Sequence, residues 1–142
     1  MKVSTKGLYG TLAVLDLAAH RATGHVHKAD IARRQGIPEQ YLAQLLSILR
    51  RAGFVQSVRG PAGGHTLARS PREISVEQVI ELLDGPQVVA RDASAANPAS
   101  KAIIMCLLRQ ADEAAAAVLR GVTFDVLVDR WRAAAGAADF VI

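Results

Sequence analysis

Residues 28–51 have the sequence KADIARRQGIPEQYLAQLLSILRR, in which two helical patterns are separated by a glycine. Apolar side chains recur at the spacing of one helix face within residues 28–35, and Gly36 ends that pattern. The second pattern follows Pro38, has i, i+3, i+4, i+7 spacing, and consists of Leu42, Leu45, Leu46 and Leu49. These patterns predict a short helix, a tight turn and a longer helix that ends near Gly53.

An extended, glycine-rich segment follows this helix pair. Residues 54–58 and 65–68 are short extended runs, and the loop RGPAGG at residues 59–64 separates them with three glycines and a proline. The runs therefore predict a β-hairpin. Two helices joined by a short turn and followed by such a hairpin are typical of the winged helix-turn-helix, in which the hairpin forms the wing.

Two further helices are predicted on either side of this unit. Apolar residues keep helical spacing from residue 5 to residue 22, and Gly24 ends the pattern. Ser75, followed three residues later by Gln78, is a capping-box signature for a helix over residues 76–83. The winged helix-turn-helix domain is therefore expected to occupy residues 1–85.

The remaining chain predicts a loop at residues 86–97 and helices with a tail at residues 98–142. Asn97 and Pro98 provide an N-cap and a first helical residue for a long helix that runs to residue 120, and Thr123 caps a last helix to residue 135. Small side chains in the long helix allow close approach of another helix, namely Ala111, Ala114, Ala115, Ala116 and Ala117. The predicted fold is mainly α with a small β-hairpin wing, and its long C-terminal helix is expected to form a homodimer.

Charge is distributed unevenly along the chain. Residues 1–72 hold 11 Lys and Arg against 3 Asp and Glu, whereas residues 73–142 hold 6 against 10. A basic region favours a polyanionic partner, because release of counterions from nucleic-acid phosphates drives sequence-independent binding. No apolar window approaches the roughly 18 residues of a membrane span, and the first residues lack a signal-peptide pattern. We therefore expect a cytoplasmic protein that binds double-stranded DNA and no membrane.

The second helix of the pair carries a polar face opposite its leucines. This face consists of Gln40, Gln44, Ser47 and Arg51, at i, i+4, i+7 and i+11. A helix in the major groove contacts base edges with such donors and acceptors, and an arginine at its end neutralises phosphate. Arg59, at the start of the wing, is expected to enter the minor groove. The same face would also suit a solvated helix or a winged-helix protein-interaction module, which are the alternative interpretations.

Four segments resemble the IscR/NsrR/CymR family of bacterial winged-helix regulators: STKGLYG at 4–10, ADIARRQGI at 29–37, YLAQLL at 41–46 and VRGPAGG at 58–64. The resemblance covers residues 1–85 and, more loosely, 98–130. It implies a homodimer whose long helix crosses that of its partner, and which binds a pseudo-palindromic operator, often as a repressor. It also implies that Lys6 and Tyr9 contact phosphates.

The candidate DNA-contacting residues are Lys6, Tyr9, Lys28, Gln40, Gln44, Ser47, Arg51, Arg59, Gly60, Gly63 and His65. Two positions depart from many family members, which have an acidic residue in place of Ala43 and an aromatic residue in place of His65. The operator sequence is expected to differ accordingly. The function predicted is a sequence-specific transcription regulator whose signal, a small molecule or a protein, the sequence does not identify.

Iron-sulfur members of the family carry three cysteines near the start of the long helix, but this chain has a single cysteine, Cys106. Ser94 and Ser100 stand at the six-residue spacing where further cysteines would be expected. One thiolate cannot hold an iron-sulfur cluster without several other ligands, so we expect no cofactor and no metal. Cys106 is interpreted either as a small buried hydrophobic residue or as a redox-sensing thiol. No acid/base pair accompanies it, so an enzyme is not expected.

Overall fold

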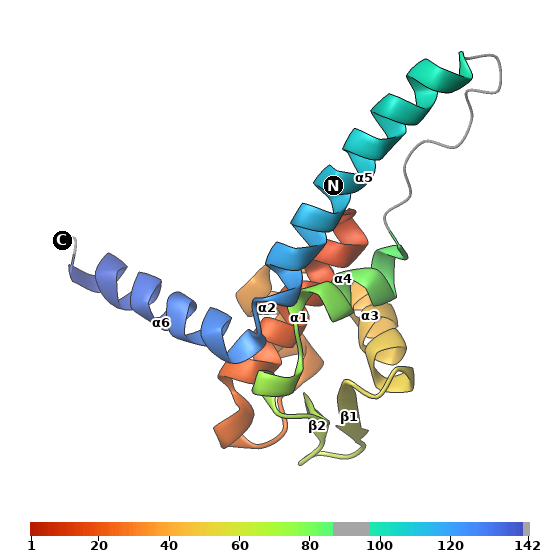
Figure 1. Ribbon diagram of the computed structural model, residues 1–142. Helices are drawn as coiled ribbons and strands as arrows, with labels where there is room; N and C mark the ends of the chain where they lie inside the picture. Colours follow the sequence, from red (N-terminus) through yellow and green to blue (C-terminus); the bar gives the residue numbers. More distant parts are fainter. Residues whose placement is uncertain (87–96, 141–142) are drawn as a thin grey trace.

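Helices dominate the computed structural model, which describes residues 1–86 and 97–140 (Figure 1). In chain order, the elements are α1 (Thr5–Ala19), the 3-10 helix η1 (Arg21–Thr23), α2 (Lys28–Gln35), α3 (Glu39–Arg51), β1 (Val55–Val58), β2 (Gly64–Leu67), the 3-10 helix η2 (Pro71–Glu73), α4 (Val76–Asp84), α5 (Pro98–Arg120) and α6 (Phe124–Phe140). This order confirms the predicted helix-turn-helix, hairpin wing and long C-terminal helices. None of the helices in the described residues is long and apolar enough to span a bilayer.

The turn between α2 and α3 depends on Gly36. This glycine has φ 67 and ψ 33, the left-handed conformation that other residues adopt only with strain, and its N–H donates to the carbonyl of Ala32. The N–H of Ile37 also donates to the Ala32 carbonyl, at 3.0 Å, and the Ile37 side chain is buried. The chain therefore reverses within a few residues and places α3 across α2.

The wing is a two-stranded antiparallel sheet. Its register pairs Val55 with Leu67 and Val58 with Gly64. Beyond this predicted hairpin, Val26 and His65 form an isolated bridge in which each backbone N–H donates to the other's carbonyl at 2.8 Å. The segment that precedes α2 therefore runs alongside β2 and ties the wing to the helix-turn-helix.

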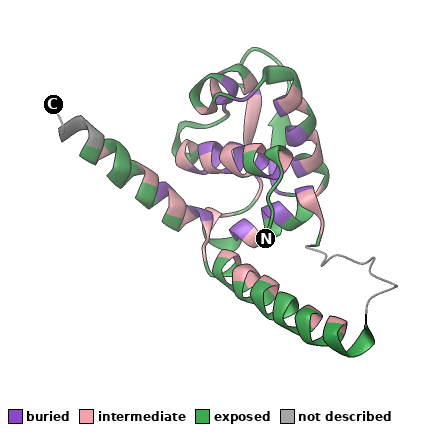
Figure 2. Ribbon diagram, turned by 90° about the horizontal axis from the view of Figure 1, so that it is seen from above, coloured by how far each residue is buried: buried purple, intermediate pink, exposed green. Residues whose placement is uncertain are grey.

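One hydrophobic core holds α1 to α4, the wing and the start of α6 together (Figure 2). Its α3 members are the four predicted leucines, Leu42, Leu45, Leu46 and Leu49. Phe124 and Val128, from the first two turns of α6, are also buried in it. Backbone hydrogen bonds fix this junction, because Val76 donates to Val122 at 3.0 Å and Phe124 donates to Ile74 at 3.1 Å. The entry to α6 is therefore part of the core of the N-terminal region.

Some helix ends differ from those predicted. α1 ends at Ala19 rather than at residue 22, because η1 follows it and the Thr23 hydroxyl donates to the His20 carbonyl at 2.7 Å. α6 continues past residue 135 to Phe140, as the alanine-rich sequence favours. The capping box of Ser75 and the Asn97 cap are both formed as predicted. Most of the predicted loop at residues 86–97 lies outside the described residues.

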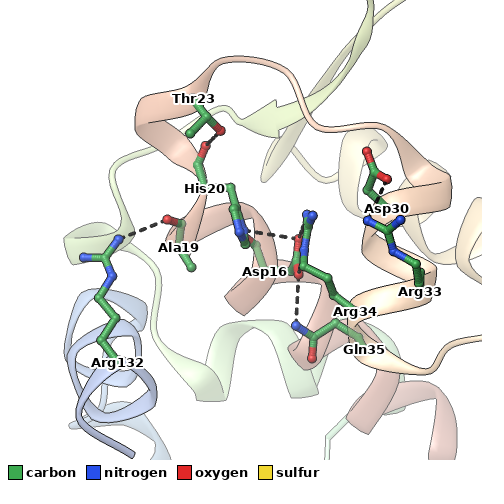
Figure 3. A network of polar contacts seen from close by, with 9 residues as sticks. All are labelled: Asp16, Ala19, His20, Thr23, Asp30, Arg33, Arg34, Gln35 and Arg132. Atoms are coloured by element: carbon green, nitrogen blue, oxygen red, sulfur yellow. Dashed lines mark hydrogen bonds and ion pairs between the residues drawn. The ribbon is translucent and has the colours of Figure 1, made fainter. Parts of the chain in front are cut away.

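An ion pair between the buried carboxylate of Asp16 and the solvent-accessible Arg34 connects α1 to α2 (Figure 3). The Asp16 side chain is fully buried, and its two carboxylate oxygens accept hydrogen bonds from Nε and Nη2 of Arg34 at 2.9 and 2.8 Å. Nε2 of Gln35 donates to the same carboxylate at 3.0 Å. The hydrogen bond and charge of Asp16 raise the pKa of Arg34 above its ordinary value. This fork is the bidentate arrangement that makes an arginine-carboxylate pair strong.

Asp16→Ala should lower the free energy of unfolding by about 2 kcal/mol, because it removes the charge-assisted hydrogen bonds that Arg34 and Gln35 donate to the buried carboxylate. Asp30→Ala is the matched control, since the exposed pair of Asp30 and Arg33 at 3.1 Å should contribute about 0.5 kcal/mol or less. Urea unfolding followed by circular dichroism, at one fixed protein concentration, measures both. Equal losses for the two variants would contradict the assignment.

Candidate nucleic-acid interface

The outer face of α3 presents the predicted polar side chains to solvent. Gln40, Gln44 and Arg51 are exposed and Ser47 is half-buried, while the leucines of the opposite face are buried. The face is therefore free to enter a groove, and its amide and hydroxyl groups can donate to and accept from base edges. Ala43 lies on its flank, also half-buried.

The N-terminus of α1 lies beside α3. The rings of Tyr9 and Tyr41 pack edge to face with centroids 5.7 Å apart. Asp84, at the end of α4, accepts hydrogen bonds from the backbone N–H and the hydroxyl of Ser4, and Ser4 in turn caps α1. These contacts fix the first turn of α1, which carries Lys6. Sequence reasoning missed Asp84, because nothing local predicts a cap supplied from 80 residues away.

Arg59 and Gly60 form the exposed tip of the wing, and Gly63 is buried at its base. A Cβ at Gly63 would lie 2.1 Å from the carbonyl oxygen of Val58, so only glycine allows the strand to approach this closely. The Gly63 N–H donates to the Gly60 carbonyl at 2.9 Å and closes the turn. Among the predicted contact residues, Gly63 therefore shapes the wing, whereas Arg59 is the side chain that projects from it.

His65 lies on β2, one residue pair from the loop of the wing, and Lys28 is among the charges that act on it. Ser57 Oγ and His65 Nδ1 are 2.8 Å apart, and His65 is half-buried. Burial, followed by the positive charges of Lys28 and Arg50, lowers the pKa of His65 below its ordinary value. Sequence reasoning missed Arg50 as a member of this group. The pair of arginines that ends α3 is the signal that would have pointed to it.

Several cations on this surface have no internal counter-charge. Arg50, Arg51 and Arg59 form no ion pair with any side chain in residues 1–86 or 97–140. Lys28 is 3.9 Å from Glu39 and is only weakly neutralised. The α3 face, the wing and the start of α2 together form a positive surface suited to phosphates.

Cys106 is exposed on α5 in this single chain, so the prediction of a small buried hydrophobic residue is wrong for the chain on its own. The physical reason is that α5 extends away from the core and buries none of its residues there (Figure 2). Ser100 lies exposed in the first turn of α5, and Ser94 falls outside the described residues. The thiol-sensor interpretation stays a prediction.

A family model described as "Rrf2: Iron-dependent Transcriptional regulator" matches residues 3–130. This description implies iron, but the chain has one cysteine and cannot provide a three-cysteine iron-sulfur site. Within residues 1–86 and 97–140, no group of three His, Cys, Asp or Glu side chains is arranged to hold a metal ion. With one cysteine, the chain does not fit the three-cysteine cluster of the iron-sulfur regulators that it resembles.

Sequence relatives share the N-terminal part of the chain. The HTH-type transcriptional regulator IscR of Aliivibrio salmonicida is 52% identical over 84 residues, which are 59% of this chain and 50% of that protein. The regulator of the same name from Pectobacterium carotovorum is 50% identical over 84 residues, with coverage of 59% and 51%. The matched segment thus spans about half the length of each of these curated relatives.

Solved structures extend the likeness to nearly the whole chain. CymR, the global cysteine regulator of B. subtilis, matches with a TM-score of 0.79 and 33% identity, covering 92% of this chain and 98% of that one. IscR of T. potens matches with a TM-score of 0.70 and 39% identity, covering 92% and 88%. These proteins are regulators rather than enzymes, and the resemblance found in the sequence is confirmed. The chain belongs to the Rrf2 family of DNA-binding, helix-turn-helix transcriptional regulators.

Proposed function

We propose that the protein binds a pseudo-palindromic operator as a homodimer, with α3 in the major groove and the wing against the backbone, and that it acts as a repressor. The observation that carries this proposal is the exposed polar face of α3, which lies beside a wing whose Arg59 forms no ion pair within residues 1–86 and 97–140. Membership of the Rrf2 family supports regulation of transcription, and the resemblance to the IscR/NsrR/CymR regulators, which often repress, favours repression.

Each part of this surface would have a distinct task. Gln44 sits at the centre of the α3 face, where a side-chain amide can make two hydrogen bonds to an adenine edge. Lys6 in the first turn of α1 and Arg51 in the last turn of α3 suit phosphate contacts, which position the protein without selecting sequence. Arg59 projects from the wing and can follow a narrow minor groove.

The operator is best found by selecting bound duplexes from a random DNA library. Gln44→Ala should then reduce discrimination at one base pair per half-site by about 1–3 kcal/mol. Lys6→Ala should weaken binding to all sequences about equally, and should reduce the slope of log affinity against log salt. Competition assays with single-base operator variants measure both effects.

Two outcomes would contradict this assignment. Equal, sequence-blind losses for Gln44→Ala and Lys6→Ala would mean that α3 does not contact bases. Failure to select any duplex, together with association that is insensitive to salt, would favour the alternative that the α3 face binds a protein.

The dimer is supported by the unpartnered surface of α5. This helix of 23 residues is about 35 Å long, leaves the core and buries none of its residues (Figure 1). Its exposed large apolar side chains are Ile103, Ile104, Leu107, Leu108 and Val118. A helix of this kind is marginally stable alone in water, and burial of its apolar stripe stabilises it. A second α5 supplies a surface of the same shape and length, with alanines that allow close approach.

Ile103→Glu should convert the protein from dimer to monomer, because it places a charge within the apolar stripe. Ala102→Glu is the control, since the exposed Ala102 lies about 100° around the helix from Ile103. Sedimentation equilibrium at micromolar concentration distinguishes the two states. A monomeric wild-type protein under these conditions would overturn the proposal.

The single cysteine gives a prediction about the signal. Anaerobic reconstitution with iron and sulfide should load no stoichiometric cluster, and the apo protein should bind its selected operator. Iron analysis and visible absorption measure the first point, and the binding assay above measures the second. If the exposed Cys106 senses oxidants, peroxide should change operator affinity in the wild type and not in Cys106→Ser. Equal responses would exclude the thiol as sensor.

A further inference from the structure

Protonatable and cationic side chains gather where the wing meets α2 and α3. The centre of this group is His65 on β2, whose environment includes positive groups from the loop before α2, from α2 itself and from the end of α3. We call this group the histidine cluster, and its members are His25, His27, Lys28, Arg50 and His65.

Backbone pairing holds the cluster together. The two 2.8 Å hydrogen bonds between Val26 and His65 place His25 and His27 on either side of the bridge, next to β2. Ser57, opposite His65 in the register of the hairpin, holds the imidazole from the other strand at 2.8 Å. The bridge therefore fixes the backbone positions of His25, His27 and His65 relative to one another, and the side chains of His25, His27 and Arg50 are exposed to solvent.

The cluster has an excess of positive charge. Burial and then the charges of Lys28, Arg50, His25 and His27 oppose protonation of His65 and lower its pKa. No carboxylate is among the groups that act on His65 in the described residues. Glu39 approaches the cluster only as the partner of Lys28, at 3.9 Å. An external anion would relieve this repulsion and favour the protonated imidazole.

The start of α2 adds to the positive electrostatic potential of the histidine cluster. His27 is the N-cap of α2, and its side chain makes no capping hydrogen bond. The first N–H groups of the helix, and the positive end of its dipole, therefore begin within the cluster. Phosphate oxygens bind well where a helix N-terminus and basic side chains coincide.

We propose that the histidine cluster binds a backbone phosphate of DNA and takes up a proton when it does so, so that DNA affinity rises as pH falls. The proposal rests on the proposed function, because it requires that the wing side of α3 lies against DNA. It adds His25, His27 and Arg50 to the contact surface. It also gives a role to His65, which stands where many family members have an aromatic residue.

The test measures binding of the full-length protein to a fluorescent random-sequence duplex of about 30 base pairs at low salt. Between about pH 7.5 and pH 6, uptake of one proton should lower Kd by about tenfold. His65→Gln, which keeps a polar side chain beside Ser57 but cannot titrate, should reduce this change to about threefold or less. The double substitution His25→Gln and His27→Gln removes two of the proposed contact side chains and should weaken DNA binding at both pH values.

His20→Gln is the matched control, because His20 lies at the end of α1, 3.5 Å from Asp16, and outside the cluster. This variant should keep the pH dependence of the wild type, and circular dichroism at both pH values checks that each variant is folded. DNA binding by the wild type that does not change with pH, or an equal change in all variants, would overturn this inference and leave the proposed function standing. An absence of DNA binding at either pH, to the random duplex and to selected duplexes alike, would overturn both.

Discussion

The carboxylate of Asp16 must be neutralised inside the fold, because an unpaired buried charge costs several kcal/mol. Arg34 and Gln35 satisfy it only when the end of α2 lies at one place along α1. α2 is too short to fix its own position, since Ile31 and Ala32 are its only buried residues. Because the turn at Gly36 is tight, the position of α2 also determines where α3 begins. The placement of the α3 face that is proposed to contact DNA thus depends on a charge pair outside that face.

Charge divides the molecule into two regions with different tasks. In the second half of the chain, acidic side chains face cations at the junction of α4, α5 and α6. Arg120 lies 3.0 Å from Glu77 and 3.5 Å from Glu113, and these contacts raise its pKa above the ordinary value. On the α3 face and wing, arginines lack such partners within the described residues. Within the described residues, acidic partners for arginines are therefore found at the junction of α4, α5 and α6. The arginines of the α3 face and wing have no such partners and are available to phosphate groups.

Local patterns were sufficient to predict most elements. The leucine stripe of α3, the capping box at Ser75 and the glycine-rich wing each depend on neighbours in the sequence, so periodicity and turn chemistry identify them. The polar face of α3 could be predicted as well, because it lies on the side of the helix opposite the leucine stripe. Its role in binding stays a prediction.

Features that depend on distant parts of the chain could not be predicted in this way. Three features bring together residues that are distant in the sequence and meet only through tertiary packing. They are the Asp16 fork, the bridge between Val26 and His65, and the burial of Phe124. The exposure of Cys106 belongs to the same class. Its helical pattern indicates an apolar face but does not say whether the chain's own core or another chain covers that face.

The junction at Phe124 determines how a dimer would present its two α3 helices. The Ser75–Thr123 bridge and the contact between Arg120 and Glu77 fasten the end of α5 to α4, and Phe124 continues that attachment into the core. α5 therefore cannot swing on a flexible linker at this end. In the proposed dimer, the crossing angle of the two α5 helices would set the distance between the two α3 faces. Because half-sites must match that distance, a signal that repacks α5 could change operator affinity without altering any residue that contacts DNA.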